Sequence, residues 1–436
     1  MSSKSNTRDE HAGFQAKELS RKVATEKEDV ECIPESQPAF MRMQINVATN
    51  SPFGNSPLGN SFSAVPFKQS DFKPAIRQQE KEMISEGNWL VGDDSLGRLP
   101  IDYPLERTSR IIAEPASVIA NRISNCLCLR SIEADFDNKR AIAKCNTLDH
   151  VRFRIRLFAP RKEEDGQRTI VEVQKRRGDT ISFLRDCRAI LNAAEGDGVD
   201  VPSEAVPVRI NFDMSSAMAG ELKMKEESGE DALTKEIGSA VGLILRDELD
   251  LNIMAFECLI ALVDPLRTLP DVALNACKTI VANDTKDTSA SEIRGAIAAL
   301  LRNGALHEDD KGDAIISDFN ETLRNLSLCL LSKIFANLLD KECLETAIQD
   351  NSEWFLDTLI PSLVDAVKNA KDRPHDALYA SDCLSNLLRA SKDLLKRADE
   401  ENALSALEEA KAFGSTHHKS LANATEKGIT MLESYS

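Results

Sequence analysis

Three arginines alternate with apolar residues along one predicted strand, the segment from His150 to Phe158. Side chains two residues apart on a strand project from the same face at intervals of about 6.6–6.8 Å, so Arg152, Arg154 and Arg156 form a row of cations. Such a row is a candidate binding patch for anionic lipid heads or for an acidic protein segment.

Further basic residues extend this row. His150 precedes it, and Lys175, Arg176 and Arg177 end the next predicted strand. Near an anionic bilayer each basic residue contributes about 1 kcal/mol. The alternative is an outward sheet face that binds nothing, with its charges paired to Glu172 on the neighbouring strand or to the acidic second half of the same chain. Both interpretations stay open at this stage.

No set of residues in the sequence matches a known catalytic arrangement. The sequence contains no G-x-S-x-G, no Walker A motif and no dinucleotide fingerprint, and its six histidines form no recognisable set with a nucleophile. Cys126 and Cys128 have no complementary ligand cluster, and the adjacent His417 and His418 are expected at the surface. We therefore predict a non-enzymatic protein with no metal, no cofactor and no small-molecule substrate.

Composition and charge indicate which partners and which cellular compartment to expect. The net charge is −17, but residues 105–196 carry +5 while residues 197–436 carry −19, and this overall acidity argues against nucleic-acid binding. The ten cysteines are scattered without C-x-x-C, which indicates a reducing compartment. No signal peptide or membrane-spanning stretch is evident. We expect a cytoplasmic protein, with the nucleus as the other possible compartment.

The elements that would position the arginines form one α+β module over residues 104–197. A helix is predicted over 115–127, then four antiparallel strands near 130–136, 141–145, 150–158 and 169–175, then a helix over 179–196. Asp179 is a suitable N-cap for the last helix, and Gly196 is a suitable C′ residue. Two helices covering one face of the sheet would give a single two-layer core.

The segment Val171–Arg185 carries a family resemblance. A strand runs through basic residues into Gly178-Asp179 and a helix with Phe183 four residues after the aspartate. Together with the order of elements, this resembles the kinase-associated C-terminal domain family over residues 110–196. The resemblance implies binding of anionic phospholipids or an inhibitory contact with a kinase domain. The chain has no kinase motifs, so only lipid binding or a contact in trans can apply.

Outside the module the chain divides into three further parts. Residues 1–103 are predicted to be a disordered arm, and 198–229 a linker. Residues 230–436 read as successive helices, and the segment from Asp376 to Leu388 resembles a helix of an armadillo-type repeat. An α-solenoid is therefore predicted, with a compact bundle as the alternative. Asn325 and Asn386 are candidates for gripping a peptide backbone, although an exposed helical asparagine need have no such role.

We therefore expect a non-enzymatic regulatory or scaffold protein. Its helical solenoid would bind a protein partner, and its basic module would bind a second acidic surface. The alternative function is a peripheral membrane adaptor whose module binds anionic phospholipids.

Overall fold

In a computed structural model of the chain, the described residues are 89–100, 102–160, 168–198, 229–246, 248–281, 288–306 and 314–435. The disordered arm predicted for residues 1–103 lies outside the described residues up to residue 88. Most of the predicted linker, from residue 199 to 228, also lies outside them. The α+β module and the helical region that follows it are both described.

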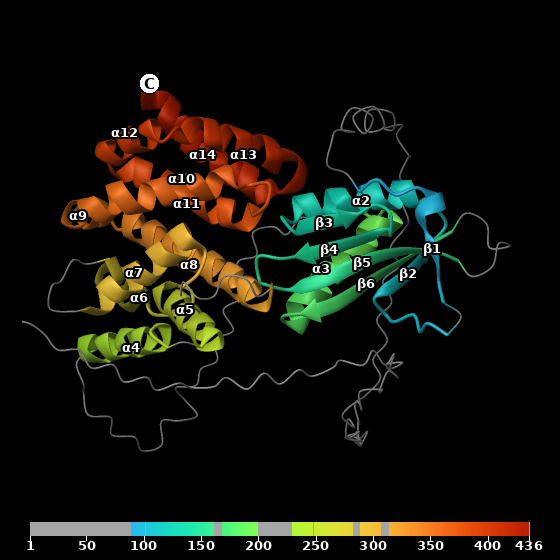
Figure 1. Ribbon diagram of the computed structural model, residues 1–436, viewed down its shortest axis with the longest axis horizontal. Helices are drawn as coiled ribbons and strands as arrows, with labels where there is room; N and C mark the ends of the chain where they lie inside the picture. The colour runs from blue at the N-terminus through green and yellow to red at the C-terminus, as the bar shows by residue number, and fades with distance from the viewer. Residues whose placement is uncertain are drawn as a thin grey trace, which may run out of the picture. The chain divides into compact units, whose positions relative to one another are not determined.

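An antiparallel sheet forms the centre of the module (Figure 1). Its strand order is β2-β6-β5-β4-β3, and β1 pairs in parallel with the end of β5. The strands are β1 (Gly97–Arg98), β2 (Ser109–Ile112), β3 (Glu133–Asp137), β4 (Ile142–Asn146), β5 (Arg152–Ala159) and β6 (Thr169–Arg177). The predicted α+β fold, with its four main strands and its two helices, is confirmed.

Two helices cover one face of this sheet, α2 (Ala116–Leu129) and α3 (Thr180–Glu195). The alternation along β5 explains why: Phe153, Ile155 and Leu157 are buried against the helices while the intervening arginines are not. The predicted caps are present. Asp179 accepts a hydrogen bond from the backbone of Ser182 at 2.7 Å, and Gly196 adopts the left-handed conformation.

Residues 89–98 also belong to this core, upstream of the boundary predicted at residue 104. Trp89 is 1 % exposed and stacks on Phe136, with 5.7 Å between ring centroids. Asp93 accepts a hydrogen bond from the backbone N–H of Ala116, which is one of the N–H groups at the start of α2 that have no acceptor within the helix. The strands β1 and β2 were not predicted because each is too short to show a period in the sequence.

The second half of the chain is a helical region (Figure 1). Its helices are α4 (Gly229–Ile244), α5 (Leu249–Val263), α6 (Pro270–Val281), α7 (Thr288–Asn303), α8 (Ala314–Asp340), α9 (Leu344–Asp350), the π-helical segment η4 (Trp354–Leu359), α10 (Ile360–Lys368), α11 (Pro374–Ala390), α12 (Lys392–Glu400), α13 (Ala403–His417) and α14 (Lys419–Tyr435). Each packs an apolar face into one continuous core.

The module and the helical region pack against each other. Leu148, in the turn between β4 and β5, contacts the apolar core of the helical region. Ser131, at the end of α2, accepts a hydrogen bond from the backbone of Ser420 at 2.8 Å, and the two hydroxyls lie 2.7 Å apart. Ser131 is 2 % exposed, so this contact is buried. The charged face of the sheet is therefore bordered by the helical region.

Candidate functional site

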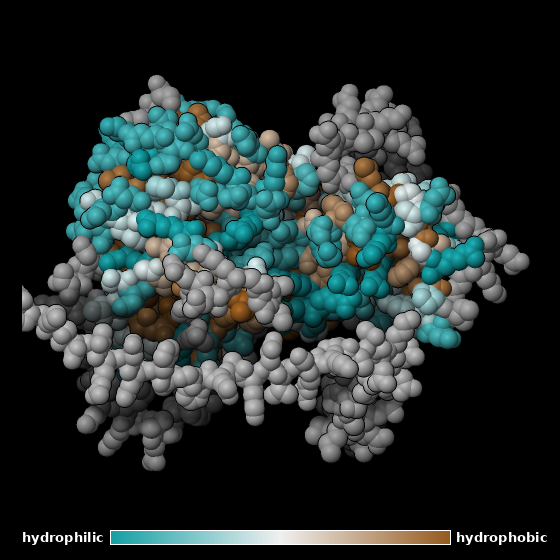
Figure 2. Space-filling model, in the orientation of Figure 1, coloured by the Kyte–Doolittle hydropathy of each residue, from teal (hydrophilic) through white to brown (hydrophobic). Residues whose placement is uncertain are grey.

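The outer face of the sheet, on the side away from α2 and α3, presents the predicted row of arginines. In antiparallel pairing, residues opposite each other share a face, and Arg154 lies opposite Gln174 while Arg156 lies opposite Glu172. Figure 2 shows hydrophilic side chains over the sheet. The predicted common face of Arg152, Arg154 and Arg156 is thus present, although the three residues have different surroundings.

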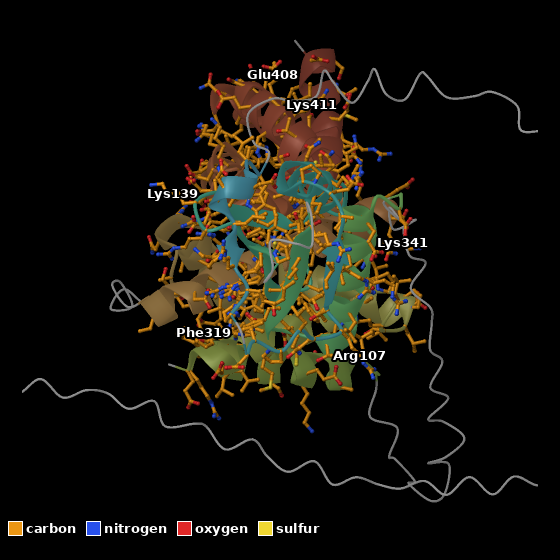
Figure 3. The ribbon with its side chains drawn as sticks, turned by 90° about the vertical axis from the view of Figure 1, so that its right-hand side faces the viewer. Arg107, Lys139, Phe319, Lys341, Glu408 and Lys411 are labelled. Carbon is orange, nitrogen blue, oxygen red and sulfur yellow. The ribbon has the colours of Figure 1, made fainter. Side chains whose placement is uncertain are left out.

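Arg152 is paired within the chain. Its guanidinium donates to Asp318 near the start of α8, and Arg177 lies 3.6 Å from the other oxygen of the same carboxylate. Arg177 also sits over the ring of Phe319, 5.3 Å from the centroid; Figure 3 labels Phe319. Two of the predicted anion-binding cations therefore belong to the contact with the helical region.

Arg154, Arg156 and Arg176 are the cations of this face that form no ion pair with any described residue. They lie close enough that Arg154 and Arg156, together with the larger effect of partial desolvation, lower the pKa of Arg176. The Nε of Arg156 is buried and has no acceptor among the described residues. A buried N–H group without an acceptor costs free energy, and a bound anion would reduce the repulsion between neighbouring cations. We call these three residues the arginine triad.

Two predicted members of the basic surface lie elsewhere. Lys175 is opposite Phe153, which places it on the helix-covered side of the sheet, where its Nζ donates to Gly178 and Thr180. His150 is not in a strand. It has φ 56° in the turn before β5 and is half-buried, and burial lowers its pKa. Side-chain alternation at the end of β6 and the turn geometry before β5 separate both residues from the triad.

The two asparagines proposed for peptide binding are not side by side. Asn325 is 6 % exposed, and its amide donates to Asp376 at 3.0 Å, in the same cluster where Arg324 donates to Asp376 at 2.6 Å. Asn386 lies ten residues beyond Asp376 on α11, about 15 Å along the helix axis, and is half-buried. Asn325 therefore holds α8 to α11 and is not available on a surface.

The expectation of a surface position for both His417 and His418 was wrong for His418, which is fully buried against His375. His417 is partly exposed, and its Nδ1 lies 2.6 Å from the hydroxyl of Thr416 and 3.2 Å from the carbonyl of Phe413. A carbonyl oxygen only accepts hydrogen bonds, so Nδ1 carries the proton. His417 in this tautomer cannot deprotonate Thr416, and the pair is not an activated nucleophile.

A comparison with protein-family models gives no match, and a search of curated proteins finds no similar sequence. The family resemblance of residues 110–196 therefore remains a prediction. Among the described residues, no helix is long and apolar enough to cross a membrane. No group of three potential metal ligands is present in the described ranges.

Proposed function

We propose that this chain is a non-enzymatic regulatory or scaffold protein that binds protein partners through its helical region and its basic module. The arginine triad carries the proposal. The triad presents positive charge on the sheet, next to a helical region whose Asp318 forms ion pairs with Arg152 and Arg177. The strands hold the backbone at these positions, so binding orders the side chains but not the backbone, which favours recognition of a carboxylate-rich segment.

The helical region supports a second contact in the same protein. Its stacked helices expose many carboxylates, and the sequence from residue 197 onward has a net charge of −19. The similarity to armadillo-type repeats remains part of the proposal. A basic module and an acidic helical array in one chain suit the bridging of two partners of opposite charge, since complementary charge sets both specificity and the rate of encounter.

The test uses the full chain and a fluorescein-labelled deca-glutamate peptide at physiological ionic strength, where the Debye length is about 8 Å. Replacing the arginine triad with alanine is expected to weaken binding at least about tenfold, because each lost charge-assisted hydrogen bond is worth more than a neutral one. The matched control replaces Lys341, Lys392 and Lys396, which are exposed on the helical region and change the net charge equally. Figure 3 labels Lys341.

The control variant is expected to bind the peptide as the unmodified chain does, to within about twofold, since long-range charge alone is screened beyond a Debye length. Equal losses in both variants would show that the triad is not a site. No binding by the unmodified chain would overturn the proposal for the module and leave only the helical region as a binding surface.

A peripheral membrane adaptor is the second candidate function, and one observation favours it. Leu105 and Ile111, which are 39 % and 60 % exposed, line a groove with Tyr103, and the hydroxyl of Tyr103 donates to Glu172 opposite Arg156. Apolar side chains beside cations suit an anionic bilayer surface. Sedimentation with phosphatidylserine vesicles but not with phosphatidylcholine vesicles, lost in the triad variant, would make this the first candidate.

A further inference from the structure

A β-bulge in β6 brings the third guanidinium of the arginine triad to the outer face of the sheet. The register between the two strands shifts at Arg152 and Phe153 of β5, which leaves Arg176 of β6 as an extra residue. Bulges redirect side chains, and without this one the alternation along β6 would turn Arg177 to the helix-covered side. With the bulge in place, Arg177 pairs with Asp318, while Arg176 stays beside the other two arginines of the triad.

The groove that this face borders carries charges of both signs. Its volume is about 690 Å³, and Arg154 and Arg176 line it. Two of its carboxylates have partners, since Asp135 accepts from Lys144 at 3.0 Å and Asp318 holds the ion pairs described above. Its other acidic and basic residues include Glu133, Glu321, Lys371 and Asp372, on β3 and on the helical wall. The groove as a whole therefore favours neither sign of charge, and any selectivity comes from the immediate surroundings of the triad.

Close to the triad the balance of charge is positive. Arg154 lies between Lys144 of β4 and Gln174 of β6. Arg156 lies opposite Glu172, the one carboxylate directly opposite a triad residue in the described sheet. Because Lys144 is paired, three guanidinium groups and one carboxylate leave a local charge of +2. A phosphorylated side chain carries about −1.5 to −2 at pH 7, so it matches this charge better than a single carboxylate does.

Three polar atoms of this face are buried without a hydrogen-bond partner among the described residues. They are the Nε of Arg156, the Oε2 of Glu172 and the Oε1 of Gln174. Glu172 is 3 % exposed, and its other oxygen accepts from the hydroxyl of Tyr103 at 2.7 Å. The nitrogen needs an acceptor and the two oxygens need donors, and each unmet need costs free energy. A phosphate group supplies the acceptor, and a peptide backbone also supplies N–H donors.

We propose that the arginine triad binds a phosphorylated side chain in an extended segment of a partner protein. The inference rests on the proposed function, because it specifies which anion the basic module selects. The phosphate oxygens accept hydrogen bonds from Arg154, Arg156 and Arg176, and backbone N–H groups of the segment donate to Glu172 and Gln174. Guanidinium groups suit this role because their planar N–H pairs match two phosphate oxygens at once.

The test measures the binding of three labelled peptides to the full chain at physiological ionic strength. The peptides share one acidic sequence and carry phosphoserine-alanine, serine-alanine or glutamate-glutamate at two central positions. The phosphoserine and diglutamate peptides have nearly the same charge, so general electrostatic attraction does not distinguish them. The phosphoserine peptide is expected to bind at least about tenfold more tightly than either of the others. Equal affinities for the phosphoserine and diglutamate peptides would overturn this inference, whereas the proposed function fails only if deca-glutamate does not bind through the triad.

A charge-conserving variant tests the role of the guanidinium groups. Replacing the three triad arginines with lysine keeps the charge but removes the planar N–H pairs, so the preference for phosphoserine over diglutamate should fall to less than about threefold. The matched control replaces Lys341, Lys392 and Lys396, which are exposed on the helical region, with arginine and should keep the full preference. A lysine variant that keeps the full preference would contradict the assignment to the triad.

Gln174→Leu and two competitors separate a peptide from other sources of phosphate. The substitution removes an acceptor for the peptide backbone, so it should weaken the phosphoserine peptide at least about threefold and leave competition by inorganic phosphate unchanged. An equal effect on both ligands, or none on the peptide, would overturn the assignment to a peptide segment. Vesicles containing phosphatidic acid should not displace the peptide, and displacement would assign the triad to a membrane surface instead.

Discussion

His375 and His418 pack edge to face, with 5.2 Å between ring centroids, where α11 and α14 meet the module. His375 is 5 % exposed and His418 is fully buried. The Nε2 of His375 lies 3.3 Å from the carbonyl of Ser131, and the Nδ1 of His418 accepts a hydrogen bond from the backbone of Leu421 at the start of α14. Both rings therefore serve the packing of the two parts, and both must stay neutral to do so.

This pair makes the packed form sensitive to acid. Burial lowers the pKa of His375 to about 4 and that of His418 to about 3, from an ordinary value of 6.5. Below pH 6.5 both histidines become protonated in the unfolded chain but stay neutral in the folded chain. The free energy of unfolding therefore falls as the pH drops from 6.5 to about 4. By pH 4.5 each histidine costs about 3 kcal/mol.

Glu133 acts in the opposite direction. Its pKa is raised to about 7 from 4.5, so the folded chain gains a proton as the pH falls from 7 to 4.5, which is stabilising relative to neutral pH. The lowered pKa of His150 adds to the loss of stability and the raised pKa of Asp382 opposes it, so three histidines against two carboxyls leave a net loss of stability on acidification. Urea midpoints measured from pH 7 to pH 4.5 should therefore decrease.

The substitution His418→Asn isolates this effect. Asparagine can accept the Leu421 hydrogen bond as an N-cap but does not titrate. The variant should lose about half of the acid sensitivity that the histidines produce, whatever it loses at neutral pH through reduced packing. An unchanged slope of urea midpoint against pH would contradict this assignment, and His417→Asn, at the partly exposed neighbour, is the control.

Asn325 and Asn386 are expected to differ in their effect on stability. Asn325→Ala removes a buried hydrogen bond to Asp376 and leaves that carboxylate with Arg324 alone, so it should destabilise the chain by about 2 kcal/mol. Asn386 is half-buried and makes no hydrogen bond with its side chain among the described residues, so Asn386→Ala should cost less than about 0.5 kcal/mol. Equal losses of unfolding free energy for the two variants in denaturant titrations would show that the hydrogen bond to Asp376 does not stabilise the chain.

Gly178 occupies a conformation that a side chain cannot enter. Its φ is +98°, and an added Cβ would lie 2.7 Å from the Cα of Val151 and 2.9 Å from the carbonyl oxygen of His150. Gly178→Ala should therefore destabilise the module by at least about 2 kcal/mol. Gly92→Ala is the control, because Gly92 has φ −95° and nothing within 4 Å of the added atom. Thermal unfolding of both variants measures the difference.

The parts of this fold that the sequence predicted are those encoded by local rules. Asp179 and Gly196 mark the ends of α3, and the alternation of Phe153, Ile155 and Leu157 defines the buried face of β5. The parts that were missed depend on contacts distant in sequence. The sequence around Trp89 does not indicate that its ring stacks on Phe136, and the strand β2 is defined by its pairing with β6.

The candidate site shows the same division. The common face of Arg154 and Arg156 follows from the period of a strand. The position of Lys175 on the opposite face of the sheet follows from the register of β5 and β6, in which it lies opposite Phe153. The pairing of Arg152 with Asp318 joins residues 166 positions apart and could not be read from either segment. His418 was expected at the surface because an isolated pair of histidines shows no sign of the ring of His375 above it.

The pairing of Asp318 with Arg152 and Arg177 leads to the last prediction. This carboxylate is 30 % exposed and competes with any acidic ligand for the two guanidinium groups nearest the arginine triad. Asp318→Asn releases both cations, so affinity for deca-glutamate should rise about threefold, while a pair this exposed should cost less than about 1 kcal/mol of stability. Asp393→Asn, at an exposed position of α12, removes the same charge without touching the sheet. A rise of the same size in both variants would assign the effect to net charge, whereas a rise confined to Asp318→Asn would show that α8 restrains the basic face.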